Sequence, residues 1–149
     1  MVITFCGHRD FIKTEKVVEQ LFLILEEVVG ENSVLFYLGG YGGFDNFAYE
    51  CCKKYKSAHA NVKLVFVTPY LTESYQKNRL QGIKANFDDI IYPELEKRLP
   101  RLAVLFRNYY MVEAADYVVA YVNRDWGGAY KTLEYAKKLG KKIINLAEL

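Results

Sequence analysis

Three clusters of glycine, histidine, arginine and asparagine each follow a short apolar run of the chain. They are Gly7-His8-Arg9, Gly39–Asp45 and Asn123–Gly128. If the apolar runs are parallel strands, their C-terminal ends meet at one edge of a sheet, where ligands of such proteins bind. Glycine lets the backbone approach a ligand closely, and arginine binds phosphate or carboxylate oxygens in pairs. The clusters therefore predict one site for a phosphate-bearing ligand.

The middle cluster carries four glycines within five residues and precedes an expected helix. The predicted ligand-binding residues here are Gly39, Gly40, Gly42, Gly43 and Asp45. The first turn of a helix has unpaired N–H groups and a partial positive charge, which suit an anion. Asp45 or Asn46 would cap this helix, or Asp45 would instead bind a ribose hydroxyl. For the glycines, the alternative to ligand contact is a tight turn that needs them only for packing. The spacing matches neither GxGxxG nor a P-loop.

In the first cluster, we predict that Gly7 permits close approach, His8 binds a base or sugar, and Arg9 binds phosphate or carboxylate. A pairing of Arg9 with Asp10 would instead make the arginine part of the scaffold. Cys6 also lies at the end of this strand and is a weaker candidate for ligand contact.

The second half of the chain adds further candidates, which are Arg107, Asn108, Asn123, Gly127 and Gly128. Arg107 follows an apolar run, where a charge needs a partner. That partner is either a ligand phosphate or a carboxylate such as Asp116. Trp126 offers a flat face for a base, unless it belongs to the core.

Apolar runs alternate with amphipathic segments along the chain. The expected strands are Val2–Cys6, Val34–Leu38, Val62–Val67, Tyr117–Val122 and Lys142–Leu146. The expected helices are Thr14–Val29, Phe44–Tyr55, Leu99–Ala115 and Ala129–Leu139. This order predicts an α/β fold, a Rossmann-like three-layer sandwich with a mainly parallel five-stranded sheet. We expect one domain over residues 1–149, with residues 70–98 a less regular excursion over the site.

Composition narrows the class of protein. The 149 residues are 52% hydrophobic, which is typical of a folded domain. Twenty basic and 18 acidic residues give a net charge of +2, so nucleic acid is not an expected partner. The three cysteines lack metal-ligand spacing, and no signal peptide or membrane span is recognisable. We expect a cytoplasmic protein that contacts no membrane, holds no metal and requires no cofactor, with a nucleotide or nucleotide-derived ligand.

Three motifs resemble the SLOG superfamily of Rossmann-like proteins, which joins LOG phosphoribohydrolases, DprA/Smf proteins and YpsA-like proteins. Phe5–Arg9 resembles the T-G-H-R or G-Y-R signature of the YpsA-like (DUF1273) branch. Arg107–Asp116 resembles its R-N-x-x-M-V-x-x-A/S-D stretch, and Gly127-Gly128 with Thr132–Ala136 resembles its G-G-then-helix element. The resemblance implies a binder of nucleotide-type ligands, and the LOG-type relatives imply a homodimer.

The LOG motif P-G-G-x-G-T-x-x-E aligns with Trp126–Glu134 and is only partly kept. Gly127, Gly128 and Glu134 match. Trp126 replaces proline, Tyr130 replaces the third glycine, and Lys131 replaces threonine. Tyr130 adds bulk where phosphate needs open backbone, and Lys131, which we include among the ligand-binding residues, would supply a compensating charge.

These observations leave three functions open. The first is binding or sensing of a nucleotide-derived small molecule at the sheet edge. The second is an N-glycosidic phosphoribohydrolase acting on nucleoside monophosphates, in which Arg107 would orient the phosphosugar and Glu134 would stabilise an oxocarbenium-like sugar or activate water. The third is binding of single-stranded DNA, which requires a cationic track with exposed aromatic side chains.

Overall fold

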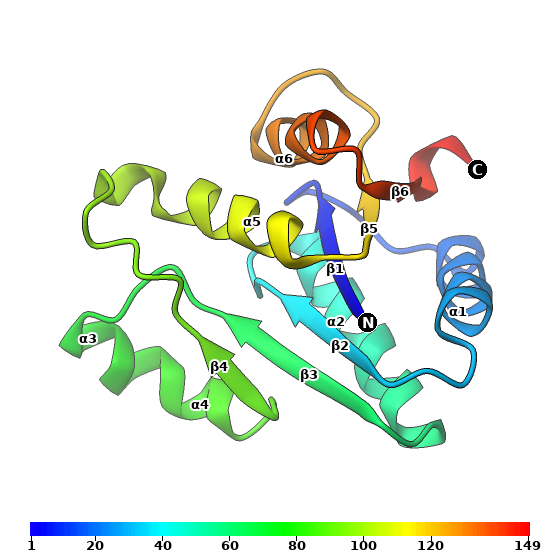
Figure 1. Cartoon of the computed structure of the whole chain (residues 1–149), viewed down its shortest axis with the longest axis horizontal. Coiled ribbons are helices and arrows are strands. Elements are labelled where there is room, and N and C mark those ends of the chain that lie inside the picture. The colour runs from blue at the N-terminus through cyan, green and yellow to red at the C-terminus, as the bar shows by residue number, and fades with distance from the viewer.

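The computed structural model describes residues 1–149, in which a single parallel sheet carries helices on both faces (Figure 1). The strands are β1 (Val2–Gly7), β2 (Val34–Leu38), β3 (Val62–Val67), β4 (Asp89–Ile91), β5 (Tyr117–Tyr121) and β6 (Lys142–Asn145). Their order is β4-β3-β2-β1-β5-β6, and every neighbouring pair is parallel. The expected α/β, Rossmann-like layout is confirmed. The expected number of five strands is wrong, because the sheet has six.

The additional strand is β4, which lies in the segment 70–98. It has three residues, and it pairs with β3 through the register Phe66↔Ile90. Three residues are too few to show an alternating pattern, so only pairing with β3 reveals the strand. The same segment contains α3 (Glu73–Tyr75), a π-helical turn η1 (Gln76–Leu80) and α4 (Gln81–Lys84).

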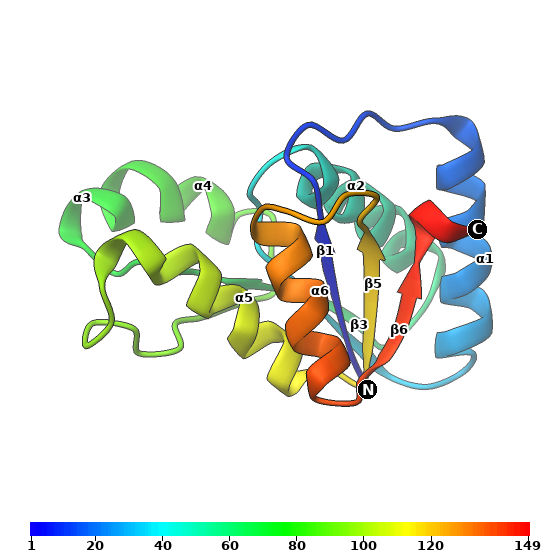
Figure 2. The same cartoon turned by 90° about the horizontal axis from the view of Figure 1, so that it is seen from above.

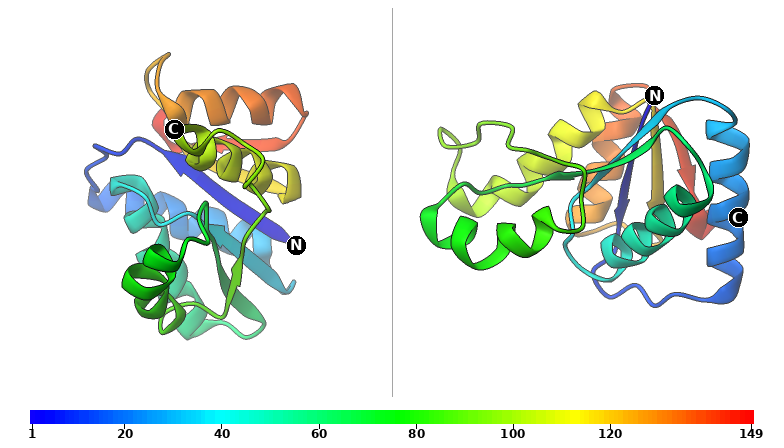
Figure 3. Two further views of the ribbon diagram at one scale, coloured as in Figure 1. Left: turned by 90° about the vertical axis from the view of Figure 1, so that its left-hand side faces the viewer. Right: turned by 90° about the horizontal axis from the view of Figure 1, so that it is seen from below.

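The remaining helices form two layers, as the view along the sheet shows (Figure 2). One layer consists of α1 (Glu15–Val29) and α2 (Gly43–Ala58), and the other of α5 (Ala103–Ala114) and α6 (Gly128–Lys138). A 3₁₀ turn, η2 (Pro100–Leu102), directly precedes α5. A 3₁₀ turn, η3 (Leu146–Glu148), ends the chain. Figure 3 shows the α3–α4 segment beside the sheet, away from α1.

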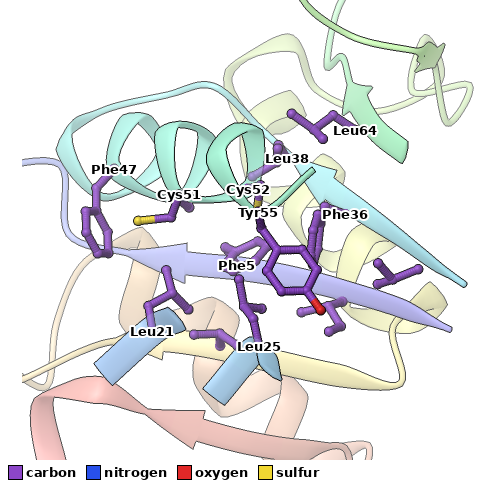
Figure 4. Packing of buried hydrophobic residues seen from close by; sticks show 14 of the residues in the cluster. Phe5, Leu21, Leu25, Phe36, Leu38, Phe47, Cys51, Cys52, Tyr55 and Leu64 are labelled. Atoms are coloured by element: carbon purple, nitrogen blue, oxygen red, sulfur yellow. The ribbon is translucent and has the colours of Figure 1, made fainter. Parts of the chain in front are cut away.

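The larger apolar core lies between the α1–α2 layer and the strands (Figure 4). Helix α1 begins where the Thr14 hydroxyl accepts a hydrogen bond from the Val17 N–H at 3.3 Å. Leu21 and Leu25, four residues apart on its inner face, pack into this core with Phe5 and Phe36 of the sheet.

The strand order places a topological switch point between β1 and β5. From β1 the chain builds the sheet outward through β2 and β3 to β4, and it then returns to the other side of β1 as β5. The connections after β1 and β5 therefore lead to helices on opposite faces and diverge, leaving a crevice at the C-terminal ends of these strands.

Two further observations concern metal sites and membrane-spanning helices. The three cysteines are free and buried, and no group of three or more metal-ligating side chains is present. No helix combines the length and apolar character that crossing a membrane requires.

We predict that Gly7→Ala destabilises the protein. A Cβ at Gly7 would lie 2.6 Å from the Cβ of Phe44, which is fully buried at the start of α2. The free energy of unfolding, measured by urea denaturation, should fall by about 3 kcal/mol, because the core cannot accept the methyl group. The control is Gly82→Ala in α4, where an added Cβ meets nothing within 4 Å. Equal stability of the two variants would show that β1 and α2 do not pack this closely.

Candidate functional site

A cavity of about 420 Å³ occupies the switch point. The end of β1, the start of α6 and one side of α5 enclose it. The lining residues are Phe5, Cys6, Gly7, His8, Arg9, Tyr41, Asp45, Arg101, Val104, Leu105, Arg107, Asn108, Arg124, Trp126, Gly127, Gly128 and Ala129.

The cavity brings together eight of the predicted ligand-binding residues, which are Gly7, His8, Arg9, Asp45, Arg107, Asn108, Gly127 and Gly128. The other predicted site residues do not line it; they are Gly39, Gly40, Gly42, Gly43, Asn123, Lys131 and Glu134. No residue of the segment 70–98 lines it either. Contact of any of these residues with a ligand stays a prediction.

The lining of the cavity is strongly cationic. Its charged side chains are four arginines and one carboxylate, namely Arg9, Arg101, Arg107, Arg124 and Asp45. The excess of positive charge here exceeds the net charge of +2 of the whole chain. Cationic side chains in a concave site favour an anionic ligand.

Arg107 is the most deeply placed of these cations, with 1% of its surface exposed. Its Nη1 donates to the carbonyl oxygens of Gly39 (3.0 Å) and Val67 (2.7 Å), at the ends of β2 and β3. Its Nε donates to the Asn108 side chain at 2.9 Å, whereas Nη2 has no hydrogen-bond partner in the protein.

No carboxylate forms an ion pair with Arg107. The alternative partner Asp116 accepts a hydrogen bond from the Val2 N–H at 2.8 Å instead. Burial lowers the pKa of Arg107, and the charge of Asp45 opposes this decrease. A guanidinium remains charged even so, which leaves a buried cation whose charge the protein does not pair.

Asp45, in the first turn of α2, holds the preceding loop by a hydrogen bond. Its Oδ2 accepts a hydrogen bond from the Tyr41 N–H at 2.8 Å. Burial raises the pKa of Asp45 to about 6, although the charge of Arg107 and the Tyr41 hydrogen bond oppose the rise. At neutral pH the cavity therefore contains one carboxylate, which would repel a phosphate in direct contact.

The glycines of the middle cluster pack against neighbouring residues. A Cβ at Gly39 would lie 2.9 Å from Cζ of Arg107, and one at Gly42 would lie 2.9 Å from Cα of Arg9. Gly42 also has φ 98°, which favours glycine. The N–H groups of Gly43 and Phe44, which open α2, donate to the carbonyls of Arg9 (2.8 Å) and His8 (3.3 Å). The start of α2 therefore offers fewer free donors than its sequence suggests.

The glycines before α6 have open surroundings. A Cβ at Gly127 or Gly128 would meet no atom within 4 Å, and Gly127 has φ 93°. The backbone hydrogen bond nearest the start of α6 runs from the Lys131 N–H to the Gly127 carbonyl at 3.0 Å. The N–H groups of Gly128 and of the next two residues therefore have no acceptor in the protein, and Gly128 and Ala129 line the cavity. This end of α6 can bind an anion.

His8 connects the two loops that border the cavity. Its buried ring accepts a hydrogen bond at Nε2 from the Asn123 N–H (3.1 Å), and its carbonyl accepts from the Phe11 and Phe44 N–H groups. Nε2 can accept only when it carries no proton, so this contact requires a neutral ring. Burial, and next the charge of Arg124, lower the pKa of His8.

Two arginines at the rim stack on exposed aromatic rings. Cζ of Arg9 lies 4.7 Å from the centroid of Tyr41, and Cζ of Arg124 lies 4.1 Å from that of Trp126. Asp10 pairs with Arg124 at 3.0 Å, so the alternative pairing with Arg9 is absent.

Sequence reasoning did not select Arg101 or Arg124 as site residues. Arg124 lies inside the third cluster, which was a usable signal, whereas Arg101 lies near the start of the expected helix Leu99–Ala115 without one.

The two remaining polar candidates of α6 are exposed and do not line the cavity. The Glu134 carboxylate pairs with Lys137 at 3.2 Å on the helix surface, and Lys131 is exposed. Cys6 does line the cavity, but burial raises the pKa of its thiol to about 12, so it stays protonated and is a poor nucleophile.

A larger groove of about 730 Å³ lies between α1 and α2. Its charged lining consists of three lysines and one glutamate: Lys13, Lys53, Lys54 and Glu50. It contains no arginine and lies away from the switch point. The arginine-rich cavity is therefore the stronger candidate for a nucleotide site.

Comparison with known proteins supports the fold. No protein-family model matches the chain. The SPbeta prophage-derived protein YoqJ of Bacillus subtilis (strain 168) is 28% identical, over 88% of this chain and 87% of its own length.

Three solved structures share the fold. DNA processing protein A from Helicobacter pylori has a TM-score of 0.63 and 18% identity over 96% of this chain, and its counterpart from Streptococcus pneumoniae has 0.62 and 15% over 95%. The chain spans 63% and 48% of the length of these two structures. The structural-genomics target TM1055 has a TM-score of 0.54 and 16% identity, over 95% of this chain and 71% of its own. At these identities, the likenesses show a shared fold.

The comparison overturns the expectation that nucleic acid is not a partner. That expectation rested on the net charge of +2. The H. pylori structure is described by its mode of binding single-stranded DNA. The net charge is a poor guide here, because it averages over the whole surface and conceals the four arginines of the cavity.

We predict that the His8–Asn123 contact makes stability depend on pH. Because the pKa of His8 is lowered on folding, the unfolded chain takes up the proton first as the pH falls below about 6.5, and stability then decreases. His8→Gln should reduce this loss, since a Gln oxygen can accept the same hydrogen bond without titrating. Urea denaturation of both proteins between pH 8 and pH 5 measures the difference. Parallel curves for the two proteins would contradict the prediction.

Proposed function

We propose that the arginine-rich cavity binds the phosphate group of a nucleotide-derived ligand. The observation on which this depends is the buried Arg107 guanidinium, which lines the cavity, has no carboxylate partner and leaves Nη2 without a hydrogen bond. An unpaired buried charge is costly, although two carbonyl hydrogen bonds offset part of the cost. A phosphate would supply the missing negative charge.

The surroundings of Arg107 support the same ligand chemistry. The free N–H groups at the start of α6 border the cavity, and their partial positive charge adds to that of the arginines. Arg9 and Arg101 are exposed, so their side chains can follow a ligand at the rim. Together these groups offer one buried cation, free backbone donors and two exposed cations.

A second candidate function is binding of single-stranded nucleic acid. Two exposed aromatic side chains at the rim favour it: Trp126 is 62% exposed and Tyr41 is 46% exposed, and each stacks with an arginine. Cationic grooves with exposed aromatic rings are typical of proteins that bind single strands. The described binding mode of the H. pylori neighbour supports this candidate.

The phosphoribohydrolase alternative receives no comparable support. Glu134, its candidate catalytic carboxylate, pairs with Lys137 outside the cavity. We further propose that the chain belongs to the YpsA-like branch, because the signature residues His8, Arg9, Arg107 and Asn108 meet in one cavity.

Arg107→Gln tests the central contact. Loss of a charge-assisted hydrogen bond of about 1.5–3 kcal/mol should weaken binding of AMP, NAD or ADP-ribose by roughly 10- to 100-fold. For the wild type, a ligand at 100 times its dissociation constant should add about 2.7 kcal/mol to the free energy of unfolding, which a thermal-shift assay detects. Calorimetry below the melting temperature of each protein then gives the dissociation constants.

A second variant covers the case in which Arg107→Gln does not fold. Gly128→Pro removes one free N–H at the first position of α6, where proline is tolerated. Gly128→Ala adds bulk in the same open space and keeps the donor. Weaker binding in the proline variant alone supports an anion site at α6. Unchanged binding in both Gly128→Pro and Arg107→Gln would refute the proposed function.

We also predict that Asp45→Asn strengthens binding in a pH-dependent way. Above pH 6 the wild-type carboxylate is ionised and repels phosphate; the amide removes this charge and can still accept from the Tyr41 N–H. The gain at pH 7.5 should be roughly fivefold, or about 1 kcal/mol, and it should vanish at pH 5, where Asp45 is protonated. Calorimetric titration at the two pH values measures it. The same gain at both values would contradict the prediction.

A further inference from the structure

We infer that the indole of Trp126 is the surface on which a nucleobase stacks, so that the cavity recognises a base together with a phosphate. This inference rests on the proposed phosphate site. It adds a specificity-determining residue and narrows the ligand to one that carries a base.

The exposure of Trp126 is unusual for its residue type. It is 62% exposed and yet lines the cavity, in the connection between β5 and α6. A large aromatic side chain is normally mostly buried, because burying it contributes strongly to stability. An indole left open at the edge of a cationic cavity is therefore available to a planar ligand.

The indole is also held in place. The Arg124 guanidinium lies 4.1 Å from its centroid, and Arg124 is itself fixed by the ion pair with Asp10 at 3.0 Å. Nε of Arg124 is buried and has no hydrogen-bond partner in the protein. A stacking surface fixed in advance loses little conformational freedom when a base binds.

The position of Trp126 in the chain connects it with the phosphate site. It directly precedes Gly127 and Gly128, and the backbone N–H of Gly128 opens α6 without an acceptor. Gly127, with φ 93°, turns the chain between the indole and this donor. In a nucleotide, one sugar separates the base from the phosphate, so consecutive residues can contact both groups.

Tyr41 is the other exposed ring at the rim, and it lacks this connection. It stacks on Arg9 at 4.7 Å, and its N–H is bound by Asp45. The helix that follows it, α2, has its first N–H groups occupied by the carbonyls of Arg9 and His8. A base on Tyr41 would therefore have no free helix donors beside it and would lie next to a carboxylate.

The experiment uses the fluorescence of Trp126, which is the single tryptophan of the chain. The wild-type protein is titrated with AMP and, by calorimetry, with ribose 5-phosphate, which carries the same phosphate without a base. We expect AMP to quench the fluorescence and to bind roughly 5- to 150-fold more tightly than ribose 5-phosphate, as stacking of about 1–3 kcal/mol implies. A twelve-residue oligo(dA) and an abasic strand of equal length form the nucleic-acid arm.

Two substitutions at this exposed position separate stacking from folding. Trp126→Leu should remove the preference for the base-bearing ligand, and Trp126→Tyr should keep most of it. If only the oligo(dA) preference over the abasic strand depends on Trp126, the inference holds with a nucleic-acid strand as the ligand. If only the AMP preference does, it holds with a free nucleotide.

The proposed function and the further inference fail in different ways. Equal binding of ligands with and without a base in the wild-type protein, or an undiminished preference in Trp126→Leu, would overturn the inference and leave the phosphate site intact. Binding that is unaffected by Gly128→Pro and Arg107→Gln would overturn the proposed phosphate site, and with it the inference. Absence of binding by all four ligands would overturn both.

Discussion

The cavity depends on a single buried cation. Arg107 enters from α5 and donates through Nη1 to the carbonyls of Gly39 and Val67, and it thereby joins the C-terminal ends of β2 and β3 to the helix above them. Its place exists only because residue 39 has no side chain. The protein supplies two carbonyl dipoles but no ion pair, so the guanidinium fixes the local geometry and still attracts an anion to the cavity.

The two glycine-rich loops serve opposite purposes around this cation. In the loop before α2, glycines let Arg9 and Arg107 pack against the backbone, and the helix donors are used within the protein. Before α6, Gly127 and Gly128 lie in open space and the donors are free. The reason for this difference lies outside the loops: the segment after β1 covers the start of α2, whereas no segment covers the start of α6. Glycine content alone therefore does not distinguish a packed turn from a binding loop.

Charge in this protein is organised locally. The sheet order brings the ends of β1 and β5 together, and η2 and α5 add Arg101 and Arg107 from a third part of the chain. Four arginines consequently share a small volume with one carboxylate, although the chain as a whole is nearly neutral. An anionic ligand would respond to this local field and not to the net charge, which is why the net charge gave a wrong expectation about nucleic acid.

The long helices and strands could be predicted from the amino-acid sequence, because their signals are local. Apolar runs set the bounds of β2 and β3 as expected, and an apolar face at helical spacing predicted a helix over Thr14–Val29, where α1 lies. Features that depend on residues distant in the chain became visible only in the folded protein. The three-residue strand β4 exists through pairing with β3. The partners of Arg107 are backbone carbonyls and not Asp116. Glu134 lies outside the cavity, whereas Arg124 and Trp126 border it. Sheet register and helix packing bring such residues together, and neither can be read from a short segment of sequence.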